Sequence, residues 1–390
     1  MAPKDFIEAR NNNQVTIVDG KPYYPSLSVD VDQDASVLSA ALTILLHGSS
    51  LSDESTKKLQ DLLTLKKVTG GITNSLFQIS GFVQDDNVVP FDFNSCLVRV
   101  FGAEGMIDRD IETCTFAHLA NAGIAPQYLG RGSNFRVEGW LDRYSPLGVM
   151  DLQQRANSEK VAAQMAKLHS FHVPDELREW HDETKPAVWD QLYAWLQQAK
   201  DITTYKTQGD DARAKRLINL DTMEKELNWV KDNVVPADAS VAFCHNDALA
   251  ANIMKHDETG EVRLIDFEYG GINFVGFDIA NHFNEYAGGT DKKNGEPDYS
   301  LFPDEIRQKG FITTYVQARR NLGKESELSE EDEVTMLLDE VKGFVLVNHL
   351  YWGLWAVNQA ANEGTESFDY IAFSHHRFQQ YLVEKEENHE

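Results

Sequence analysis

Basic residues are scarce in this sequence. It carries 36 lysines and arginines against 62 aspartates and glutamates, so its formal net charge is −26. A surface of that sign repels the phosphates of nucleic acids and of anionic lipids. We therefore expect neither a nucleic acid nor an anionic membrane as the main partner. The acidity would favour a cationic ligand, although it also serves solubility alone.

The sequence also lacks long apolar runs and a secretory signal. Its start, MAPKDFIEARNNNQ, has neither the basic nor the apolar region of a signal peptide. The longest apolar runs, 37–46 and 344–357, are too short to cross a bilayer, and the second contains Asn348 and His349. We expect a soluble, cytoplasmic protein without an integral membrane segment.

Cysteine and proline are also rare. The three cysteines, Cys96, Cys114 and Cys244, have no CxxC or metal-ligand spacing, so buried reduced thiols are the simplest account. With 11 prolines, 42% hydrophobic and 25% charged residues, the composition is that of an ordinary globular protein. A chain of 390 residues exceeds the size at which one core usually keeps growing, so we expect two lobes.

The order of predicted elements indicates an α+β protein in two parts. Residues 1–140 begin with two helices and continue with strands and a helix that Asp108 caps, which predicts a small antiparallel sheet with one helix packed on it. Residues 141–390 are mostly helical, with one island of short strands. Helices are expected at 34–46, 53–65, 108–122, 158–172, 187–200, 211–232, 303–321, 328–361 and 367–385, and strands at 66–69, 75–83, 96–101, 241–244, 253–255 and 262–267.

The strongest functional signal lies in this strand island. Asp247, in His245-Asn246-Asp247, is followed five residues later by Asn252 and fourteen residues after that by Asp266. Phosphoryl transfer needs one carboxylate to accept the proton of the alcohol or orient its oxygen, and another carboxylate with an amide to hold Mg²⁺. Each fragment alone is often an accident, but the combination predicts a kinase site. We expect His245 to orient the loop rather than to act as an acid or base.

Two upstream features fit a nucleotide site. Residues 69–75, Thr-Gly-Gly-Ile-Thr-Asn-Ser, join two predicted strands, and backbone amides in such a turn can approach phosphate oxygens, although a plain hairpin turn would give the same pattern. Arg99 lies among apolar residues in mid-strand, where a charge needs a partner, and we expect an ion pair with Glu112 on the following helix. The alternative is an arginine that points to solvent from an edge strand.

Five segments together resemble the choline/ethanolamine kinase family, between about residue 66 and residue 383. They are VTGGITNSLFQ (68–78), LVRVFG (97–102), FCHNDALAANIM (243–254), IDFEYGGINFVGFDIANHF (265–283) and YWGLW (351–355). The resemblance implies a two-lobed protein-kinase-like fold with ATP between the lobes. It implies Asp247 as catalytic base, Asn252 and Asp266 as Mg²⁺ ligands, and Glu268 near the metal. The residues that it places at ATP are Gly70, Gly71, Thr73, Asn74, Ser75, Arg99 and Glu112.

The same resemblance implies an aromatic pocket for a small amino alcohol. An ammonium over a tryptophan or tyrosine face gains about 0.5 to 2 kcal/mol. Trp352 and Trp355 are three residues apart, so they could also simply pack against each other in a helix core. The residues that match or neighbour the family's aromatic cage are Tyr269, Trp352, Trp355, Phe368, Tyr370 and Phe373.

The segments NHFNEYAG (281–288) and PDYSLFP (297–303) resemble the ethanolamine branch of the family. The expected reaction is ATP-dependent phosphorylation of ethanolamine, the first step of phosphatidylethanolamine synthesis by the CDP-ethanolamine route. The alternatives are a choline or dual-specificity kinase, an aminoglycoside phosphotransferase-like kinase, and a non-catalytic binding protein. Ala251 replaces a glycine that is common in the family, and 290–296 reads as a surface loop. Family members are often dimers, so a homodimer is a further expectation.

Overall fold

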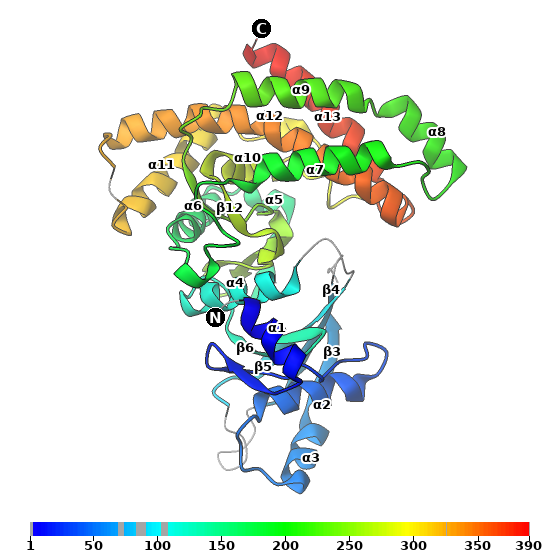
Figure 1. Cartoon of the computed structure of the whole chain (residues 1–390). Coiled ribbons are helices and arrows are strands. Elements are labelled where there is room, and N and C mark those ends of the chain that lie inside the picture. The colour runs from blue at the N-terminus through cyan, green and yellow to red at the C-terminus, as the bar shows by residue number, and fades with distance from the viewer. Residues whose placement is uncertain (1–2, 69–73, 83–90, 103–107, 325, 390) are drawn as a thin grey trace. The chain divides into compact units, whose positions relative to one another are not determined.

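A computed structural model describes residues 3–68, 74–82, 91–102, 108–324 and 326–389 of the chain (Figure 1). It divides into two compact units. The first contains Met1–Tyr144, Val173–Trp180 and His256–Thr259, and the second contains Ser145–His172, His181–Lys255 and Gly260–Glu390. The first unit is built around a sheet and the second is mainly helical, so the expected α+β organisation in two lobes is confirmed.

In the first unit, the described residues form a seven-stranded sheet with strand order β1-β2-β6-β7-β5-β4-β3. Neighbouring strands are antiparallel except β2 and β6. The strands are β1 (Thr16–Val18), β2 (Lys21–Tyr23), β3 (Thr64–Val68), β4 (Asn74–Ser80), β5 (Ser95–Phe101), β6 (Tyr128–Arg131) and β7 (Phe135–Gly139), and the helices are α1 (Pro3–Asn12), α2 (Asp34–Leu45), α3 (Asp53–Leu62) and α4 (Arg109–Asn121). The sequence analysis did not anticipate α1, β1 or β2, because three-residue strands carry too little periodicity.

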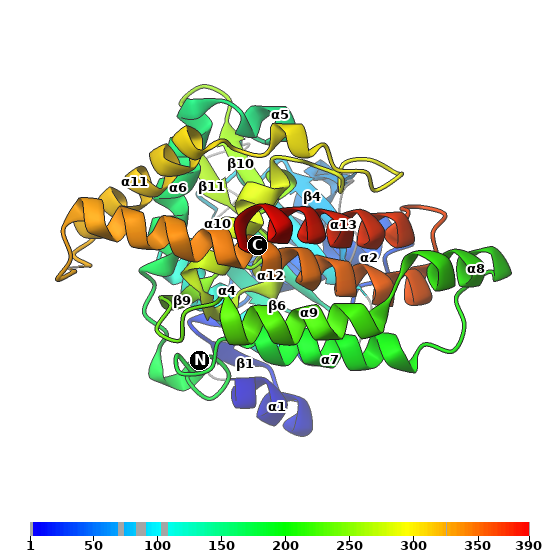
Figure 2. The same ribbon diagram turned by 90° about the horizontal axis from the view of Figure 1, so that it is seen from above.

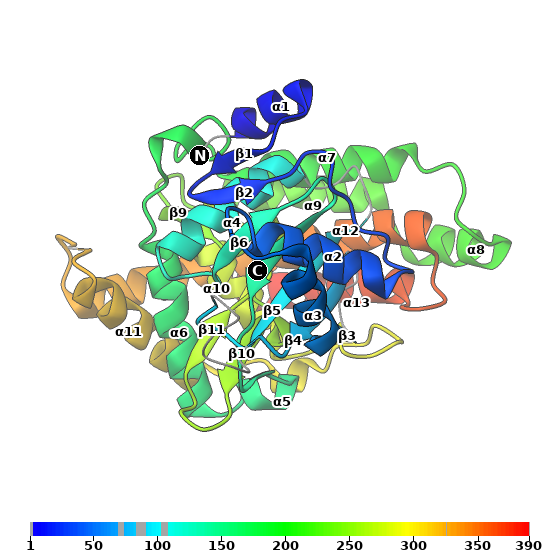
Figure 3. The same cartoon turned by 90° about the horizontal axis from the view of Figure 1, so that it is seen from below.

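The two faces of this sheet differ in chemistry. One face packs against α2 and α3 in a hydrophobic core (Figure 3). Its members on β5 and β7 are Cys96, Val98, Val100, Phe135 and Val137. Successive side chains of a strand point to opposite faces, so Arg99, Arg136 and Glu138 lie on the other face. All three are buried, and the sheet therefore presents a group of charged side chains away from its apolar core.

The second unit contains a layer of long helices in which α12 packs against α7, α9 and α13 (Figure 2). Strand β10 pairs with β11, and β12 pairs with β9, in antiparallel ladders that flank residues 245–252, the segment of the predicted base. The helices are α5 (Val149–Leu152), α6 (Arg155–His169), α7 (Ala187–Asp201), α8 (Gln208–Leu217), α9 (Leu220–Asn233), α10 (Val275–Glu285), α11 (Glu305–Asn321), α12 (Glu330–Glu363) and α13 (Tyr370–His389); the strands are β8 (Tyr144–Pro146), β9 (Val241–Cys244), β10 (Ile253–His256), β11 (Val262–Leu264) and β12 (Gly271–Phe274).

In the second unit the short α5 was not predicted, and two longer segments also differ from the expectation. The helix predicted at 211–232 is broken into α8 and α9, and Asn219 caps the second by accepting a hydrogen bond from the backbone N–H of Thr222. Helix α10 was not anticipated. Every one of its residues is buried, including the polar Asp278, Asn281, His282 and Glu285. These four residues have the spacing of one helix face, which was the available signal in the sequence.

Three further expectations can be compared with the fold. Cys96, Cys114 and Cys244 are buried and form no disulfide, as predicted. In the part of the chain that the structure describes, no helix is both long and apolar enough to cross a membrane. The loop 290–296 is exposed apart from Gly295, so the prediction of a surface loop there is confirmed.

Glu340 on α12 gives the fold a dependence on pH. Its side chain is 5% exposed, and its Oε2 has no hydrogen-bond partner among the described residues. Burial, together with the charge of Asp238, raises the pKa of Glu340 to about 7. Between about pH 4.5 and pH 7 the folded protein keeps this proton while the unfolded chain loses it, so stability falls as the pH rises, by about 3 kcal/mol in total.

We therefore expect Glu340→Gln to stabilise the protein at pH 8 and to leave its stability nearly unchanged at pH 4.5. Urea unfolding at both pH values measures the difference. Glu331→Gln, an exposed position on the same helix, is the control and should change neither value. An equal gain in stability for Glu340→Gln at both pH values would show that the ionisation of this carboxyl is not the cause.

Candidate active site

The predicted base lies in a loop between β9 and β10. Asn246 has a left-handed backbone, φ 64°, which turns the chain after β9 and presents Asp247. A short 3₁₀ turn, Ala250–Asn252, then returns Asn252 toward it. The Nδ2 of Asn252 donates to the backbone oxygen of Asp247 at 3.0 Å and to its Oδ2 at 3.2 Å. The two residues, five positions apart in the sequence, therefore share one loop.

Asp266 is attached to the same loop through His245. The Nε2 of His245 donates to the backbone oxygen of Ile265 at 2.9 Å, and its Nδ1 accepts from the backbone N–H of Asp247 at 3.3 Å. Burial lowers the pKa of His245, which favours this neutral form. Asp266 itself has a left-handed backbone, φ 64°, a conformation that aspartate tolerates better than most residues. His245 thus links the segments of Asp247 and Asp266. Both of its ring nitrogens are used in these hydrogen bonds.

Asp278, on the first turn of α10, was not among the predicted site residues. It anchors residues 245–252, which carry the predicted base and are called the catalytic loop below. Its Oδ1 accepts from the backbone N–H of Asn246 at 2.7 Å. Its Oδ2 accepts from the backbone N–H of His245 and from the Nε2 of His169, each at 2.9 Å. Burial favours a raised pKa for Asp278, but the hydrogen bond from His169 and the nearby histidines outweigh it and the pKa is lowered. An aspartate inside the apolar run GFDIA was the available signal, because a buried carboxylate needs several donors.

His169, Cys244 and Asp278 also lie within 4.8 Å of one another, a spacing that could suit a metal. Their donors are already engaged. His169 and Asp278 are bonded to each other, and burial raises the pKa of the Cys244 thiol well above its usual value, which disfavours the thiolate that binds metals. We therefore interpret this group as the anchor of the loop.

Carboxylates crowd the catalytic loop. Burial first, and then the charges of Glu285, Asp266 and Glu268, raise the pKa of Asp247 well above its usual value. Such a concentration of negative charge is stabilised by a divalent cation, and every available donor is an oxygen, as Mg²⁺ prefers. Asn252 uses its Nδ2 to hold Asp247, so its Oδ1 is the atom that can face a cation. The residues predicted to hold Mg²⁺ therefore fit that ion chemically.

The six predicted cage aromatics form one continuous chain of ring contacts. Tyr269 contacts Trp352, Trp352 contacts Trp355, and Trp355 contacts Tyr370, with ring centroids 6.0, 5.3 and 5.5 Å apart. Phe368 extends the chain to Tyr370 at 4.8 Å and to Phe373 at 5.6 Å. The chain begins beside the catalytic loop, because the backbone oxygen of Tyr269 accepts a hydrogen bond from Asn246 at 2.9 Å.

Glu285, at the end of α10, is a second acid that the sequence analysis did not single out. It is 6% exposed, and its Oε2 accepts a hydrogen bond from the hydroxyl of Thr290 at 3.5 Å. Burial raises the pKa of Glu285 to about 7, against the opposing charge of Arg377. A carboxylate buried with so little compensation is a natural partner for a cationic ligand.

The predicted nucleotide residues lie in the first unit. Asn74 begins β4, and its Oδ1 accepts from the backbone N–H of Gly102 at 3.4 Å. Ser75 is paired with Val100 of β5. The rest of the predicted phosphate turn, Gly70, Gly71 and Thr73, lies outside the described residues.

Arg99 is buried, so the alternative of a solvent-exposed arginine is wrong, but its predicted ion pair with Glu112 is also wrong. The Nε of Arg99 donates to the Oε1 of Glu138 at 2.8 Å. Glu112 instead pairs with the Nη1 of Arg136 at 2.5 Å. Helix α4 packs toward β6, and β7 lies between β6 and β5, so the acid on α4 meets Arg136 before it can reach Arg99.

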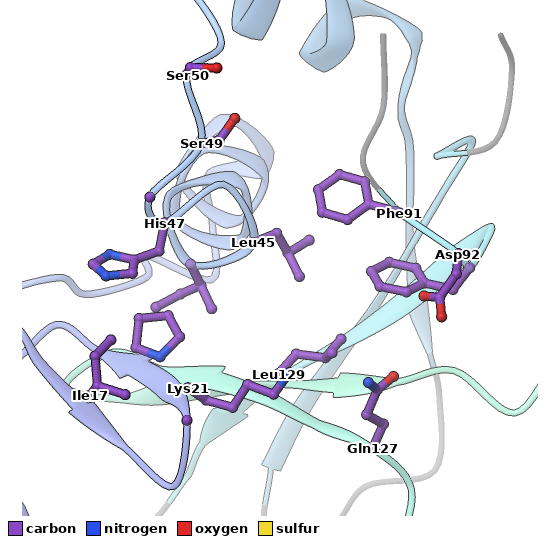
Figure 4. Close-up of a pocket in the computed structure, with 15 residues that line it drawn as sticks. Ile17, Lys21, Leu45, His47, Ser49, Ser50, Phe91, Asp92, Gln127 and Leu129 are labelled. Carbon is purple, nitrogen blue, oxygen red and sulfur yellow. The ribbon is translucent and has the colours of Figure 1, made fainter. Parts of the chain in front are cut away.

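A pocket of about 620 Å³ lies elsewhere in the first unit, between the β1–β2 hairpin and the end of α2 (Figure 4). Leu45, Phe91 and Leu129 give it an apolar wall, and Lys21, His47 and Gln127 are among its polar residues. None of the predicted catalytic, nucleotide or substrate residues lines it. The reaction is therefore not placed in this pocket.

Comparisons with known proteins identify the family of the chain. The sequence model of the choline/ethanolamine kinase family matches residues 65–382. The chain is 32% identical to probable choline kinase 3 of Arabidopsis thaliana over 86% of this chain and 94% of that protein, and 32% identical to mouse (Mus musculus) ethanolamine kinase 1 over 96% and 97%. Its fold is similar to a Plasmodium vivax ethanolamine kinase, with a TM-score of 0.71 and 21% identity over 98% of this chain and 95% of that one. A choline kinase from Cryptosporidium parvum has the same TM-score, with 22% identity over 91% and 96%. The chain belongs to the choline/ethanolamine kinase family.

Proposed function

We propose that this protein transfers the γ-phosphoryl group of ATP to the hydroxyl of ethanolamine and forms phosphoethanolamine, the first intermediate of the CDP-ethanolamine route. The observation that carries the proposal is the direct attachment of the aromatic chain to the catalytic loop through the hydrogen bond between Asn246 and Tyr269. A small amino alcohol held by its ammonium among the rings would place its hydroxyl at the base.

In the proposed reaction, Asp247 accepts the hydroxyl proton while the alcohol oxygen bonds to the γ-phosphorus and the bond to the departing ADP oxygen breaks. Asn252 holds the carboxylate of Asp247 in place through its Nδ2. Asn252, Asp266 and Glu268 would bind Mg²⁺, which neutralises phosphate charge when present. Asn74, Ser75, Arg99 and the turn at 70–73 would bind ATP, as the family resemblance implies.

Glu285 supports ethanolamine as the substrate. An ammonium with three N–H donors can bond directly to a buried carboxylate, whereas a quaternary head group offers none. The aromatic chain by itself would serve choline equally well, because a cation over ring faces needs no hydrogen bond. A choline or dual-specificity kinase is therefore the second candidate, and relatives named for both substrates are equally similar in sequence.

A coupled ADP-release assay with ATP and Mg²⁺ tests the proposal by comparing kcat/KM for ethanolamine and choline, with kanamycin as a third substrate. We expect a preference for ethanolamine of at least about tenfold, which corresponds to about 1.4 kcal/mol. In Glu285→Gln the value for ethanolamine should fall more than the value for choline. A preference for choline would favour the second candidate, and turnover of kanamycin alone would contradict both.

A further inference from the structure

A chain of buried polar side chains connects helix α13 to the ring of Trp352. The Nη2 of Arg377 on α13 donates to the Oδ1 of Asn348 on α12 at 2.5 Å. The Nδ2 of Asn348 donates to the Oδ1 of Asn281 on α10 at 2.8 Å. The indole Nε1 of Trp352 donates to that same Oδ1 at 2.6 Å. Arg377, Asn348 and Asn281 are called the Trp352 support chain below.

The direction of every hydrogen bond in this chain is fixed by its two ends. An indole N–H can only donate, so the Asn281 atom that faces Trp352 must be its oxygen. The Asn348 atom that faces the same oxygen must then be its nitrogen, which turns the Asn348 oxygen toward Arg377. A guanidinium also can only donate, so that end agrees. Asn284 fits the same direction, because its Nδ2 donates to the Asn348 oxygen at 2.8 Å.

The support chain is costly for the fold, which makes a purely structural role a poor explanation. Arg377 and Asn281 are each 1% exposed, and Asn348 is fully buried. The charge of Arg377 acts on the carboxylates of Glu285 and Glu384, but among the described residues it forms no direct ion pair with either of them. Its direct contacts are two oxygens of Asn348 and the ring of Phe373. Taking an arginine out of water costs free energy that hydrogen bonds to one asparagine offset only in part, so we expect Arg377 to serve more than packing.

We propose that Arg377, Asn348 and Asn281 are positioning residues that fix the plane of the Trp352 ring and thereby set the affinity for the ammonium group of the substrate. This inference rests on the proposed function, in which Trp352 contacts that group. A cation is attracted to the face of an indole and not to its edge, so a ring free to rotate would hold the substrate more weakly. None of the three residues needs to touch the substrate to have this effect.

Asn348→Asp is the sharpest test, because it preserves the shape of the side chain and the contact with Arg377. The new carboxylate has no N–H for Asn281, so the Asn281 amide must rotate, and Trp352 loses its acceptor. We expect KM for the better of the two substrates, ethanolamine or choline, to rise at least about fivefold, while KM for ATP stays within about twofold. Arg377→Met is the second variant, in case the first does not fold, and should act in the same direction.

Repeating Asn348→Asp in a protein that already carries Trp352→Phe separates an effect on the ring of Trp352 from a general loss of packing. Phenylalanine has no N–H group that Asn281 could hold. In that Trp352→Phe protein, Asn348→Asp should change KM for the amino alcohol by less than about twofold. Tyr381→Phe is the matched control, since it removes a different α13 hydrogen bond, to Glu226 at 2.6 Å, and should leave KM unchanged. An unchanged KM in Asn348→Asp and Arg377→Met, or the same increase in both backgrounds, would overturn the support chain alone. A wild-type protein that phosphorylates neither substrate would overturn the proposed function and this inference together.

Discussion

Asp247→Asn is expected to lower kcat by at least about 100-fold, the usual contribution of a positioned base, and to leave KM for ATP within about twofold. The substitution is isosteric, and the remaining amide oxygen can still accept the hydrogen bond that Asn252 now donates to Oδ2. The loop therefore keeps its shape while it loses the group that accepts the hydroxyl proton. Steady-state kinetics with varied ATP and varied amino alcohol measure both parameters.

The control for this variant is Asp221→Asn, which removes one negative charge from the exposed first turn of α9. It should show wild-type kinetics. Circular dichroism and thermal unfolding of Asp247→Asn confirm that it remains folded. Turnover near the wild-type rate in the folded variant would remove Asp247 from the role of base and would leave the family assignment intact.

Asp266→Asn is expected to lower Mg²⁺-dependent turnover by about three orders of magnitude, because a metal that neutralises phosphate charge contributes several kcal/mol to transition-state stabilisation. Asparagine is preferred to alanine here. Asp266 has a left-handed backbone, φ 64°, which asparagine also tolerates. The substitution therefore removes the negative charge and keeps the backbone conformation. Activity as a function of Mg²⁺ concentration is the measurement.

The chain provides a matched control for this second variant. Asp19 in the β1–β2 turn is also an aspartate with a left-handed backbone, φ 54°, and lies in the first unit. Asp19→Asn repeats the same chemical change at a residue that is not predicted to bind Mg²⁺, and it should keep the wild-type dependence on Mg²⁺. If Asp266→Asn is active at ordinary Mg²⁺ concentrations, the ion must be held by other residues.

Elements with a clear period and clear caps were predictable from the sequence. Asp108 was assigned as the cap of the helix after β5, and its carboxylate accepts from the backbone N–H groups of Asp110 and Ile111. Helix α10 was missed although Asp278, Asn281, His282 and Glu285 have the spacing of one helix face. The sequence could not show that this polar face is buried in the fold. The positions of Asp247, Asn252 and Asp266 within one set of loops agree with what their spacing suggested.

Contacts that depend on the order of strands in the sheet could not be predicted from the sequence. Glu112 and Glu138 were both available to Arg99, and only the position of β7 between β5 and β6 decides that Glu138 is its partner. The contacts of Asp278 could not be predicted either, because its three hydrogen-bond donors come from two segments that are distant in the sequence. The aromatic candidates could be named one by one, but their connection through Trp355 and Tyr370 needs the packing of α13 on α12.

Helix α10 also bears on the length of the substrate. Asp278 near its start anchors the loop of the base, and the Nδ1 of His282 donates to the backbone oxygen of Ala248 in that loop at 3.0 Å. Glu285 at its end is the proposed partner of the ammonium. Seven residues of α-helix span about 10 Å, and this rise hardly stretches. The interval between the reacting hydroxyl and the charged nitrogen is then set by backbone geometry. Substitutions among the rings would change which head group binds, but not how long a carbon chain the enzyme accepts.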